Sequence, residues 1–388
     1  HDVMRVTFFA TEKGILTRVL KMASAAHFAG IKIQLIVCFP PEQDYIIDPN
    51  IVEEVLVFPL SIVHIKDILA SVHKFGSSLC HVFVGCSSNF NEALLMLGLH
   101  LPVVGDPYDL CRAQYIKWED EEELQKNVFY ESLWFKVVDS ICIRNHYFKT
   151  KEFLSAYTPG KAIFYAPDPA RKNRCRRNAH NIEASKLNIM VDGIGSSEAA
   201  HKAAFIELLS ITKTSNNFKF FIYRSEYDFS KIFGDNIKIF PLLEPAVYEE
   251  LMRSCDAFMI PWAYDYVKNS GYSDNLRLST RSTATDILEA DIVNITPDYF
   301  ELTGKNTLKC GRAIIFNQED QRNPDFWKSL PQRVAQIRSA PSDLHQFLDS
   351  TIGPHLKSFY QRTIRYAQKN SALQSRVRSA ILRALQKM

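Results

Sequence analysis

A polar segment that follows a short apolar strand carries the residues best suited to binding an anion. Residues 257–260 (AFMI) predict a buried strand, and residues 284–290 predict a helix. The first turn of a helix binds anions, usually phosphate, through its free N–H groups and the helix dipole. The predicted binding residues are Asn275, Arg277, Ser279, Thr280, Arg281, Ser282 and Thr283. The alternative is a solvated loop that ends in a Ser/Thr-capped helix.

A second candidate phosphate loop contains Gly193 and Gly195, after a strand predicted at 187–191. The dinucleotide-binding fingerprint also needs a third glycine and an acidic residue about 20 positions further on, and neither is cleanly present. The sequence has no Walker A, GxSxG, HExxH or CxxC motif, which argues against nicotinamide, flavin, hydrolase and metal sites. We therefore expect no metal and no bound cofactor.

Two series of alternating strands and helices must position these residues. Apolar strands and helices with one apolar face alternate first from residue 4 to 165 and again from 187 to 316. This alternation is typical of doubly wound parallel sheets. The predicted domains are an N-terminal Rossmann-like domain (1–170), a basic linker (171–186), a second Rossmann-like domain (187–345) and C-terminal helices (346–388).

Composition limits the classes of protein that this chain can belong to. Its 388 residues are 46% apolar and 23% charged, which is typical of ordinary soluble proteins. The formal net charge of +3 is too small to indicate a nucleic-acid-binding protein. No two of the eight cysteines have CxxC spacing, which predicts reduced thiols. No apolar run reaches membrane-spanning length and no signal peptide is visible. We therefore expect a cytoplasmic protein.

Several segments resemble glycosyltransferases of the GT-B fold, in particular the large family-four group. Residues 11–14 (TEKG) resemble the glycine loop after the first strand of those enzymes. Residues 81–110, 127–145 and 161–170 resemble their later first-domain elements, and 248–262 (YEELMRSCDAFMIPW) resemble the run into the donor site. The resemblance implies an α/β protein with two Rossmann-like domains facing a cleft and a helical C-terminal tail.

The resemblance also implies a nucleotide-sugar donor held mainly by the second domain and an acceptor on the first. The donor-binding set then adds Gly14 and Arg224 to Gly193, Gly195 and the residues from Asn275 to Thr283. The acceptor would be a glycan or a lipid-linked sugar in bacterial surface polysaccharide synthesis. Two alternatives stay open: an epimerase of the same fold, and a non-catalytic nucleotide- or sugar-binding protein, which the lack of the family's glutamate pair favours.

Glycosyl transfer needs stabilisation of the leaving diphosphate and, if configuration inverts, a base for the acceptor hydroxyl. Arg277, Arg281 and the hydroxyl cluster suit a metal-independent reaction. The predicted bases are Asp106 and Asp109, which follow a strand predicted at 101–104. The alternative for each is an aspartate that caps a turn. His81 begins an apolar strand and is predicted to be a core residue.

The basic linker and the arginine- and lysine-rich C-terminal helices form a second positively charged feature. They are either ordinary solvated surfaces or a means of holding the protein at an anionic membrane. No nucleic-acid partner is expected.

Overall fold

A computed structural model describes most of the chain. The described residues are 3–40, 47–84, 90–107, 120–144, 161–171, 182–192, 199–213, 217–225, 227–243, 245–261, 263–269, 283–385 and 387. The chain divides into two compact units: the first comprises residues 1–169 and 346–388, and the second comprises residues 170–345.

The described part of the first unit contains a seven-stranded parallel sheet with the order β3-β2-β1-β4-β5-β6-β7. Its strands are β1 (Arg5–Ala10), β2 (Lys32–Val37), β3 (Glu54–Val57), β4 (Leu79–Val84), β5 (Val103–Pro107), β6 (Ser140–Ile143) and β7 (Ala162–Tyr165). Its helices are η1 (Lys13–Ile15), α1 (Leu16–Phe28), η2 (Ile62–His64), α2 (Ile65–Phe75), α3 (Phe90–Gly98), α5 (Glu121–Val137), η4 (His345–Phe347, at the unit boundary) and α16 (Asp349–Leu385).

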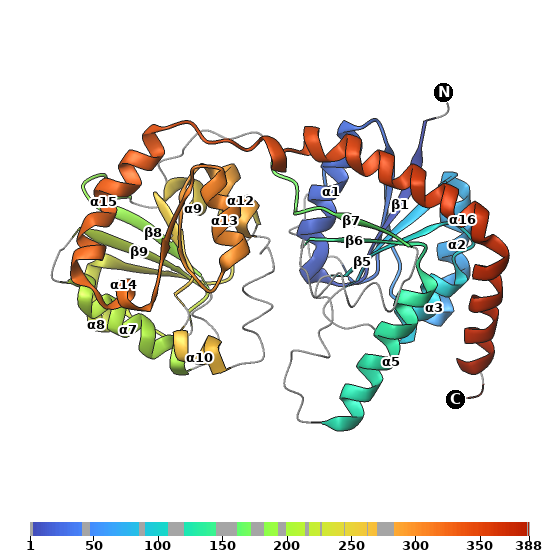
Figure 1. Cartoon of the computed structure of the whole chain (residues 1–388), viewed down its shortest axis with the longest axis horizontal. Coiled ribbons are helices and arrows are strands. Elements are labelled where there is room, and N and C mark those ends of the chain that lie inside the picture. The colour runs from blue at the N-terminus through green and yellow to red at the C-terminus, as the bar shows by residue number, and fades with distance from the viewer. Residues whose placement is uncertain are drawn as a thin grey trace. The chain divides into compact units, whose positions relative to one another are not determined.

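Helices cover both faces of this sheet (Figure 1). On one face, Phe8 and Val104 pack with apolar residues of α1 and α16. On the other face, Val82 and Ile141 pack with α2, α3 and α5. Gly105 lies where Trp134 of α5 approaches the sheet, and a β-carbon there would lie 2.4 Å from the Trp134 ring. Because side chains alternate between the faces of a strand, each residue's position in its strand decides which helices it meets.

The C-terminal helix α16 belongs to the first unit. Leu356, Phe359 and Tyr360 are completely buried in its core. Gly353 permits this contact, because a β-carbon at that position would lie 2.2 Å from the backbone oxygen of Ala25 in α1. The sequence predicts residues 346–388 as a separate helical segment, whereas in the structure this segment completes the core of the first unit.

The described part of the second unit contains a six-stranded parallel sheet with the order β10-β9-β8-β11-β12-β13. Its strands are β8 (Leu187–Val191), β9 (Phe218–Tyr223), β10 (Ile237–Phe240), β11 (Ala257–Met259), β12 (Val293–Pro297) and β13 (Ala313–Phe316). Its helices are α7 (Ala199–Lys213), α8 (Ser230–Phe233), η3 (Gly234–Asn236), α9 (Pro245–Ser254), α10 (Tyr264–Asn269), α12 (Thr283–Ala290), α13 (Glu301–Lys309), α14 (Gln318–Arg322) and α15 (Pro324–Ser339). Residues of α7 and α15 pack on one face, and residues of α9 and α12 pack on the other.

Two local predictions differ from the structure. Residues 264–269 form the short helix α10, within the polar segment for which the sequence predicts no helix before residue 284. Strand β5 continues through Asp106 to Pro107 and pairs Asp106 with Phe83 of β4, although the sequence ends this strand at Val104. Among the described helices, none combines the length and the apolar composition needed to cross a bilayer.

Candidate functional site

Each sheet has one point at which the order of its strands reverses. In the first unit this point lies between β1 and β4, and in the second between β8 and β11. Open parallel sheets bind ligands outside the carboxyl ends of the strands at such a point. The predicted donor-binding loops follow these strands: Gly14 comes after β1, Gly193 and Gly195 after β8, and Ser279 to Thr283 lie between β11 and β12.

Arg224 lies at the carboxyl end of β9, the strand next to β8. Its backbone has φ 54°, one of two positive values found for non-glycine residues in the described chain. Its N–H donates to the carbonyl of Phe240 at 2.9 Å, which extends the pairing of β9 with β10 by one residue. The side chain is exposed, and its guanidinium lies 5.0 Å from the centre of the Tyr223 ring. A strained backbone is often found at a functional site, so Arg224 presents a positive charge at a conformational cost.

Tyr248 of α9 lies near the same edge of the second sheet. Its ring contacts Tyr223 with 4.9 Å between centres. Burial raises the pKa of the Tyr248 hydroxyl well above its usual range, and the nearby carboxylates Asp192 and Asp286 raise it further. Asp192 directly follows β8, and Asp286 lies in the first turn of α12. This edge therefore combines the neutral hydroxyl of a partly buried tyrosine, two carboxylates and the cation of Arg224.

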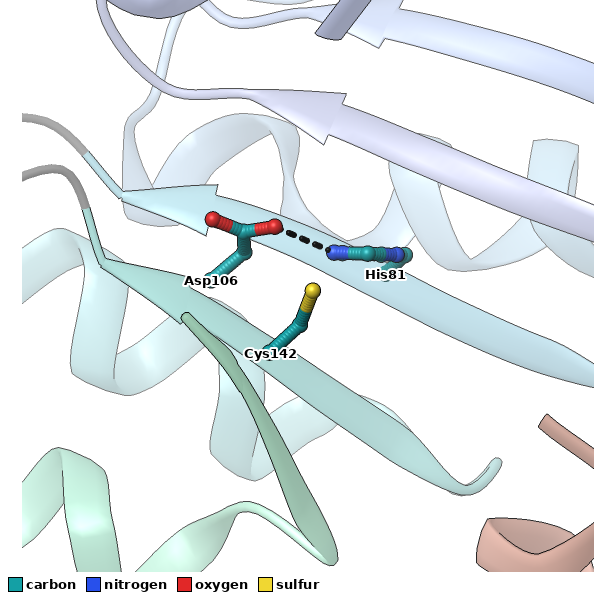
Figure 2. A group of neighbouring side chains, drawn as sticks. All are labelled: His81, Asp106 and Cys142. Atoms are coloured by element: carbon teal, nitrogen blue, oxygen red, sulfur yellow. Dashed lines mark hydrogen bonds and ion pairs between the residues drawn. The ribbon is translucent and has the colours of Figure 1, made fainter. Parts of the chain in front are cut away.

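A buried polar cluster lies in the first unit, on the face of the sheet that α1 and α16 cover. Nε2 of His81 in β4 lies 2.9 Å from Oδ2 of Asp106 in β5, with Cys142 of β6 beside them (Figure 2). Nδ1 of His81 lies 2.6 Å from the hydroxyl of Tyr360 in α16. Since a carboxylate accepts hydrogen bonds, Nε2–H donates to Asp106 and the free Nδ1 accepts from Tyr360.

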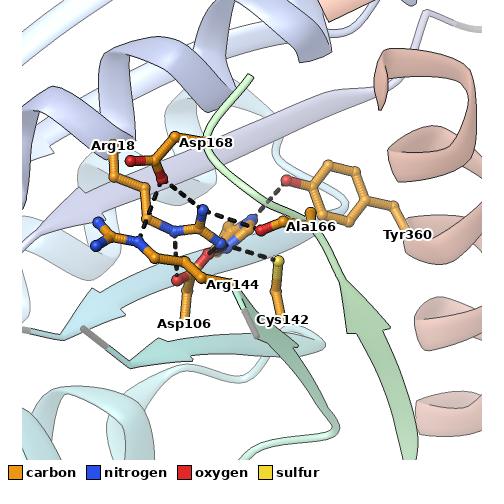
Figure 3. Close-up of polar contacts among 8 residues, drawn as sticks. Arg18, Asp106, Cys142, Arg144, Ala166, Asp168 and Tyr360 are labelled. Carbon is orange, nitrogen blue, oxygen red and sulfur yellow. Dashed lines mark hydrogen bonds and ion pairs between the residues drawn. The ribbon is translucent and has the colours of Figure 1, made fainter. Parts of the chain in front are cut away.

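Arg18 of α1 connects this cluster to the end of β7. Its Nε lies 2.8 Å and a terminal nitrogen 3.0 Å from the two oxygens of Asp106. The other terminal nitrogen lies 2.8 Å from Asp168 and 3.2 Å from the carbonyl of Ala166 (Figure 3). Arg144 lies 3.2 Å from the same oxygen of Asp168. Two arginines and two aspartates thus balance their charges inside the unit, as buried charges must.

The protonation states follow from burial and charge. Burial alone would raise the pKa of the Asp106 carboxyl, but Arg18 and the His81 hydrogen bond lower it to about 2. Burial lowers the pKa of His81 more than Asp106 raises it, which keeps the ring neutral. Burial also raises the pKa of the Cys142 thiol, so the sulfur stays protonated.

His81, Asp106 and Cys142 bring three potential metal-ligand atoms within 4.8 Å of one another. A metal would need the Cys142 thiolate and a free nitrogen lone pair on His81. The sulfur instead contacts Arg18 at 3.6 Å, and both His81 nitrogens have partners. Arg18 binds Asp106 and contacts Cys142, while Tyr360 and Asp106 occupy the two nitrogens of His81. The cluster is therefore a buried ion-pair network and does not suit a metal.

The structure describes one of the two predicted bases. Asp106 is completely buried, and both its oxygens bind neighbouring side chains. The sequence places it in a loop, but it lies inside β5 on the face covered by α1 and α16. Asp109 lies outside the described residues. A catalytic role for either stays a prediction.

Four of the predicted donor-binding and base residues are described: Gly14 is exposed in η1, Arg224 is exposed after β9, Thr283 begins α12, and Asp106 lies in β5. Gly193, Gly195, Asn275, Arg277, Ser279, Thr280, Arg281 and Ser282 lie outside the described residues, so their predicted contacts stay predictions. The sequence did not single out Arg18, Asp168 or Tyr360. The available signal was weak: Arg18 is one charged residue close in sequence to the buried apolar residues Leu16, Val19 and Met22 of α1.

No family model matches the sequence, and no curated protein matches it. Solved structures do match the fold. A Listeria monocytogenes protein assigned as a UDP-N-acetylglucosamine 2-epimerase matches over 93% of this chain and 98% of its own, with a TM-score of 0.58 and 10% identity. The UDP-GlcNAc 2-epimerase of Neisseria meningitidis, bound to UDP-GlcNAc, covers 92% and 99%, with a TM-score of 0.53 and 10% identity.

An O-GlcNAc transferase mutant from Thermobaculum terrenum matches 96% of this chain and 69% of its own, with a TM-score of 0.56 and 11% identity. The predicted GT-B-like fold is therefore confirmed. It is a fold of nucleotide-sugar enzymes that include transferases and an epimerase. The narrower assignment to family four stays a prediction.

Proposed function

We propose that this protein transfers a sugar from a nucleotide-sugar donor to an acceptor. The observation that carries the proposal is Arg224, an exposed cation whose backbone is held at positive φ at the carboxyl edge of the second sheet. It follows the strand next to the β8–β11 switch point, where this fold class binds ligands. A donor diphosphate supplies the negative charge that such a cation would bind.

The chemical role of this edge is to stabilise the leaving group. Negative charge grows on the nucleoside diphosphate as its bond to the sugar breaks, and fixed cations and N–H groups lower the barrier most when they face that charge. Arg224 and the first turn of α12, which Thr283 begins, are the described contributors. Arg277 and Arg281 are the further candidates from the sequence. We propose a metal-independent reaction without a bound cofactor.

The first unit would hold the acceptor. A base must contact the hydroxyl from which it takes a proton. Asp106 is completely buried within the first unit, with a pKa of about 2. An inverting reaction would therefore use Asp109 in preference to Asp106. We propose a glycan or lipid-linked acceptor in bacterial surface polysaccharide synthesis.

An epimerase is the second candidate. Two of the matching structures carry that activity in their names, and both align over more than nine-tenths of this chain and of their own. Such an enzyme would invert one carbon of the donor sugar and would need no acceptor. The buried, fully engaged state of His81 and Asp106 argues against their moving a proton on a sugar.

Binding and turnover separate these activities. Thermal-shift measurements with UDP, GDP, CMP and ADP sugars should identify a stabilising donor. With that donor, a transferase releases nucleoside diphosphate in proportion to added acceptor, whereas an epimerase produces an inverted sugar nucleotide without acceptor. Binding without either product would support a non-catalytic protein. Failure of every nucleotide sugar to stabilise the chain would refute both enzyme proposals.

A further inference from the structure

Helix α16 has one face that is fixed to the first unit. Leu356, Phe359 and Thr363 of this face are completely buried. Nζ of Lys357 donates to the carbonyl of Ala29 at 3.1 Å, and Arg378 lies 3.6 Å from Asp139. Two of the basic residues of the C-terminal segment therefore serve internal contacts.

The remaining basic side chains lie on another face. Arg362, Arg365, Lys369, Arg376 and Arg383, here called the cationic stripe, are all exposed. They are spaced three, four, seven and seven residues apart, which places them along one side of a helix with 3.6 residues per turn. The stripe is about 30 Å long at a rise of 1.5 Å per residue.

No nearby negative charge in α16 neutralises the stripe. The sequence contains no aspartate or glutamate after Asp349, and Asp349 itself accepts from Ser24 at 3.0 Å. Within the described part of the chain, none of the five stripe residues forms an ion pair with a carboxylate. Five positive charges in line on a protein with a net charge of only +3 indicate a surface made for an anionic partner.

Two exposed apolar side chains lie between cations of the stripe. Leu373 lies four residues after Lys369 and three before Arg376, and its side chain is 60% exposed. Ala380 continues the same line between Arg376 and Arg383 and is also exposed. A helix side that combines lysine and arginine with an exposed leucine suits the boundary between lipid headgroups and acyl chains, because the cations bind phosphates while the leucine leaves water.

The linker at 171–186 has no comparable surface in its described residues. Arg171 lies 3.1 Å from Glu289, and Lys186 lies 3.0 Å from Glu183. We infer that the outward side of α16, formed by the cationic stripe and Leu373, binds the surface of an anionic phospholipid bilayer. This inference does not rest on the proposed glycosyl transfer, since the surface would hold an enzyme of any chemistry at a membrane.

Cosedimentation of the full chain with phosphatidylcholine vesicles, with and without phosphatidylserine, tests this surface. We expect binding only with phosphatidylserine and weaker binding as salt rises. Lys369→Glu with Arg376→Glu should lower the partition coefficient at least about 25-fold, because each cation near an anionic membrane contributes about fivefold. The control is Lys328→Glu with Arg333→Glu, which changes net charge equally on exposed positions of α15.

Leu373→Ser tests the apolar contribution at constant charge. It should lower binding about tenfold if the side chain enters the interface, with unchanged circular dichroism and nucleotide-sugar stabilisation. An equal loss in the α15 control would attribute binding to net charge and overturn the inference. So would a lack of vesicle binding, or tighter binding to duplex DNA or RNA that the stripe variant abolishes.

Discussion

The hydroxyl of Tyr360 donates a hydrogen bond to Nδ1 of His81 across 2.6 Å, although the two residues are 279 positions apart in the chain. Both side chains are completely buried. His81 in turn donates to Asp106, and Asp106 binds Arg18. The C-terminal helix is therefore joined by a polar chain to α1 and to two central strands of the first sheet.

Tyr360→Phe should destabilise the protein by about 1–3 kcal/mol, because it leaves the buried Nδ1 of His81 without a donor. The measurement is the free energy of unfolding in urea. Tyr366→Phe is the matched control, since this α16 tyrosine is only partly buried. Equal effects of the two changes would contradict a specific role for the Tyr360 hydroxyl.

Asp106→Asn should cost about 3–5 kcal/mol, because removing one partner of a buried ion pair leaves Arg18 undercompensated. Asp109→Asn should reduce sugar transfer if the reaction inverts. The two variants are compared by urea unfolding and by release of nucleoside diphosphate. An Asp106→Asn protein of normal stability that had lost all turnover would show that the carboxylate acts in catalysis.

Stability should fall as the pH drops below about 6.5. The folded protein keeps His81 neutral because its pKa is lowered, whereas an unfolded histidine gains a proton near pH 6.5. The unfolded state then binds more protons, so acid favours it, by up to about 1.4 kcal/mol per pH unit. Protonation of Asp106 lowers the free energy of unfolding further as the pH falls from 3.8 toward its folded pKa of about 2, because the unfolded carboxyl gains its proton first.

Urea unfolding between pH 7.5 and 5 would measure the effect of His81. A His81→Gln variant should show a shallower dependence on pH than the unchanged protein. His27→Gln, at an exposed position of α1, provides the control. If His81→Gln kept the original slope, the neutral buried histidine would not be its source.

Arg224→Gly should separate stability from binding. Glycine adopts a positive φ without the cost that a side chain carries, which is about 1 kcal/mol or more, so the free energy of unfolding should not decrease. Nucleoside diphosphate affinity, measured by calorimetry, should fall about 10- to 100-fold with loss of a charged hydrogen bond. The control is Arg333→Ala, because Arg333 also lies over an aromatic ring, 5.5 Å from the centre of Phe326. Alanine is used there because glycine would destabilise the interior of helix α15. Unchanged affinity of Arg224→Gly would remove Arg224 from the donor site.

Periodicity predicted most of the described elements, because fully buried parallel strands leave continuous apolar runs. It predicted β8 at 187–191 with the bounds found in the structure. It could not predict that Asp106 continues β5, since a carboxylate after Val103-Val104-Gly105 looks like the start of a loop. The partners that make this position possible, Arg18 and His81, lie 88 and 25 residues away.

The sequence also did not predict which residues of the C-terminal segment contact the first unit. Its lysines and arginines look alike in the sequence, and only the packing of α16 distinguishes Lys357 and Arg378, which bind the first unit, from the exposed cations. Arg224 was predicted as a donor ligand from its place after a strand. Its positive φ is a backbone angle that a linear pattern does not contain.

The composition of the first unit from residues 1–169 and 346–388 has a consequence for synthesis on the ribosome. A nascent chain emerges from its N-terminus, so the first sheet leaves the ribosome long before Leu356, Phe359 and Tyr360 are made. Until α16 is made, apolar residues of α1 and of one face of that sheet stay exposed to water. The second unit, residues 170–345, is continuous and can complete its core first. The order of folding during translation should therefore be the reverse of the order of the two sheets in the gene.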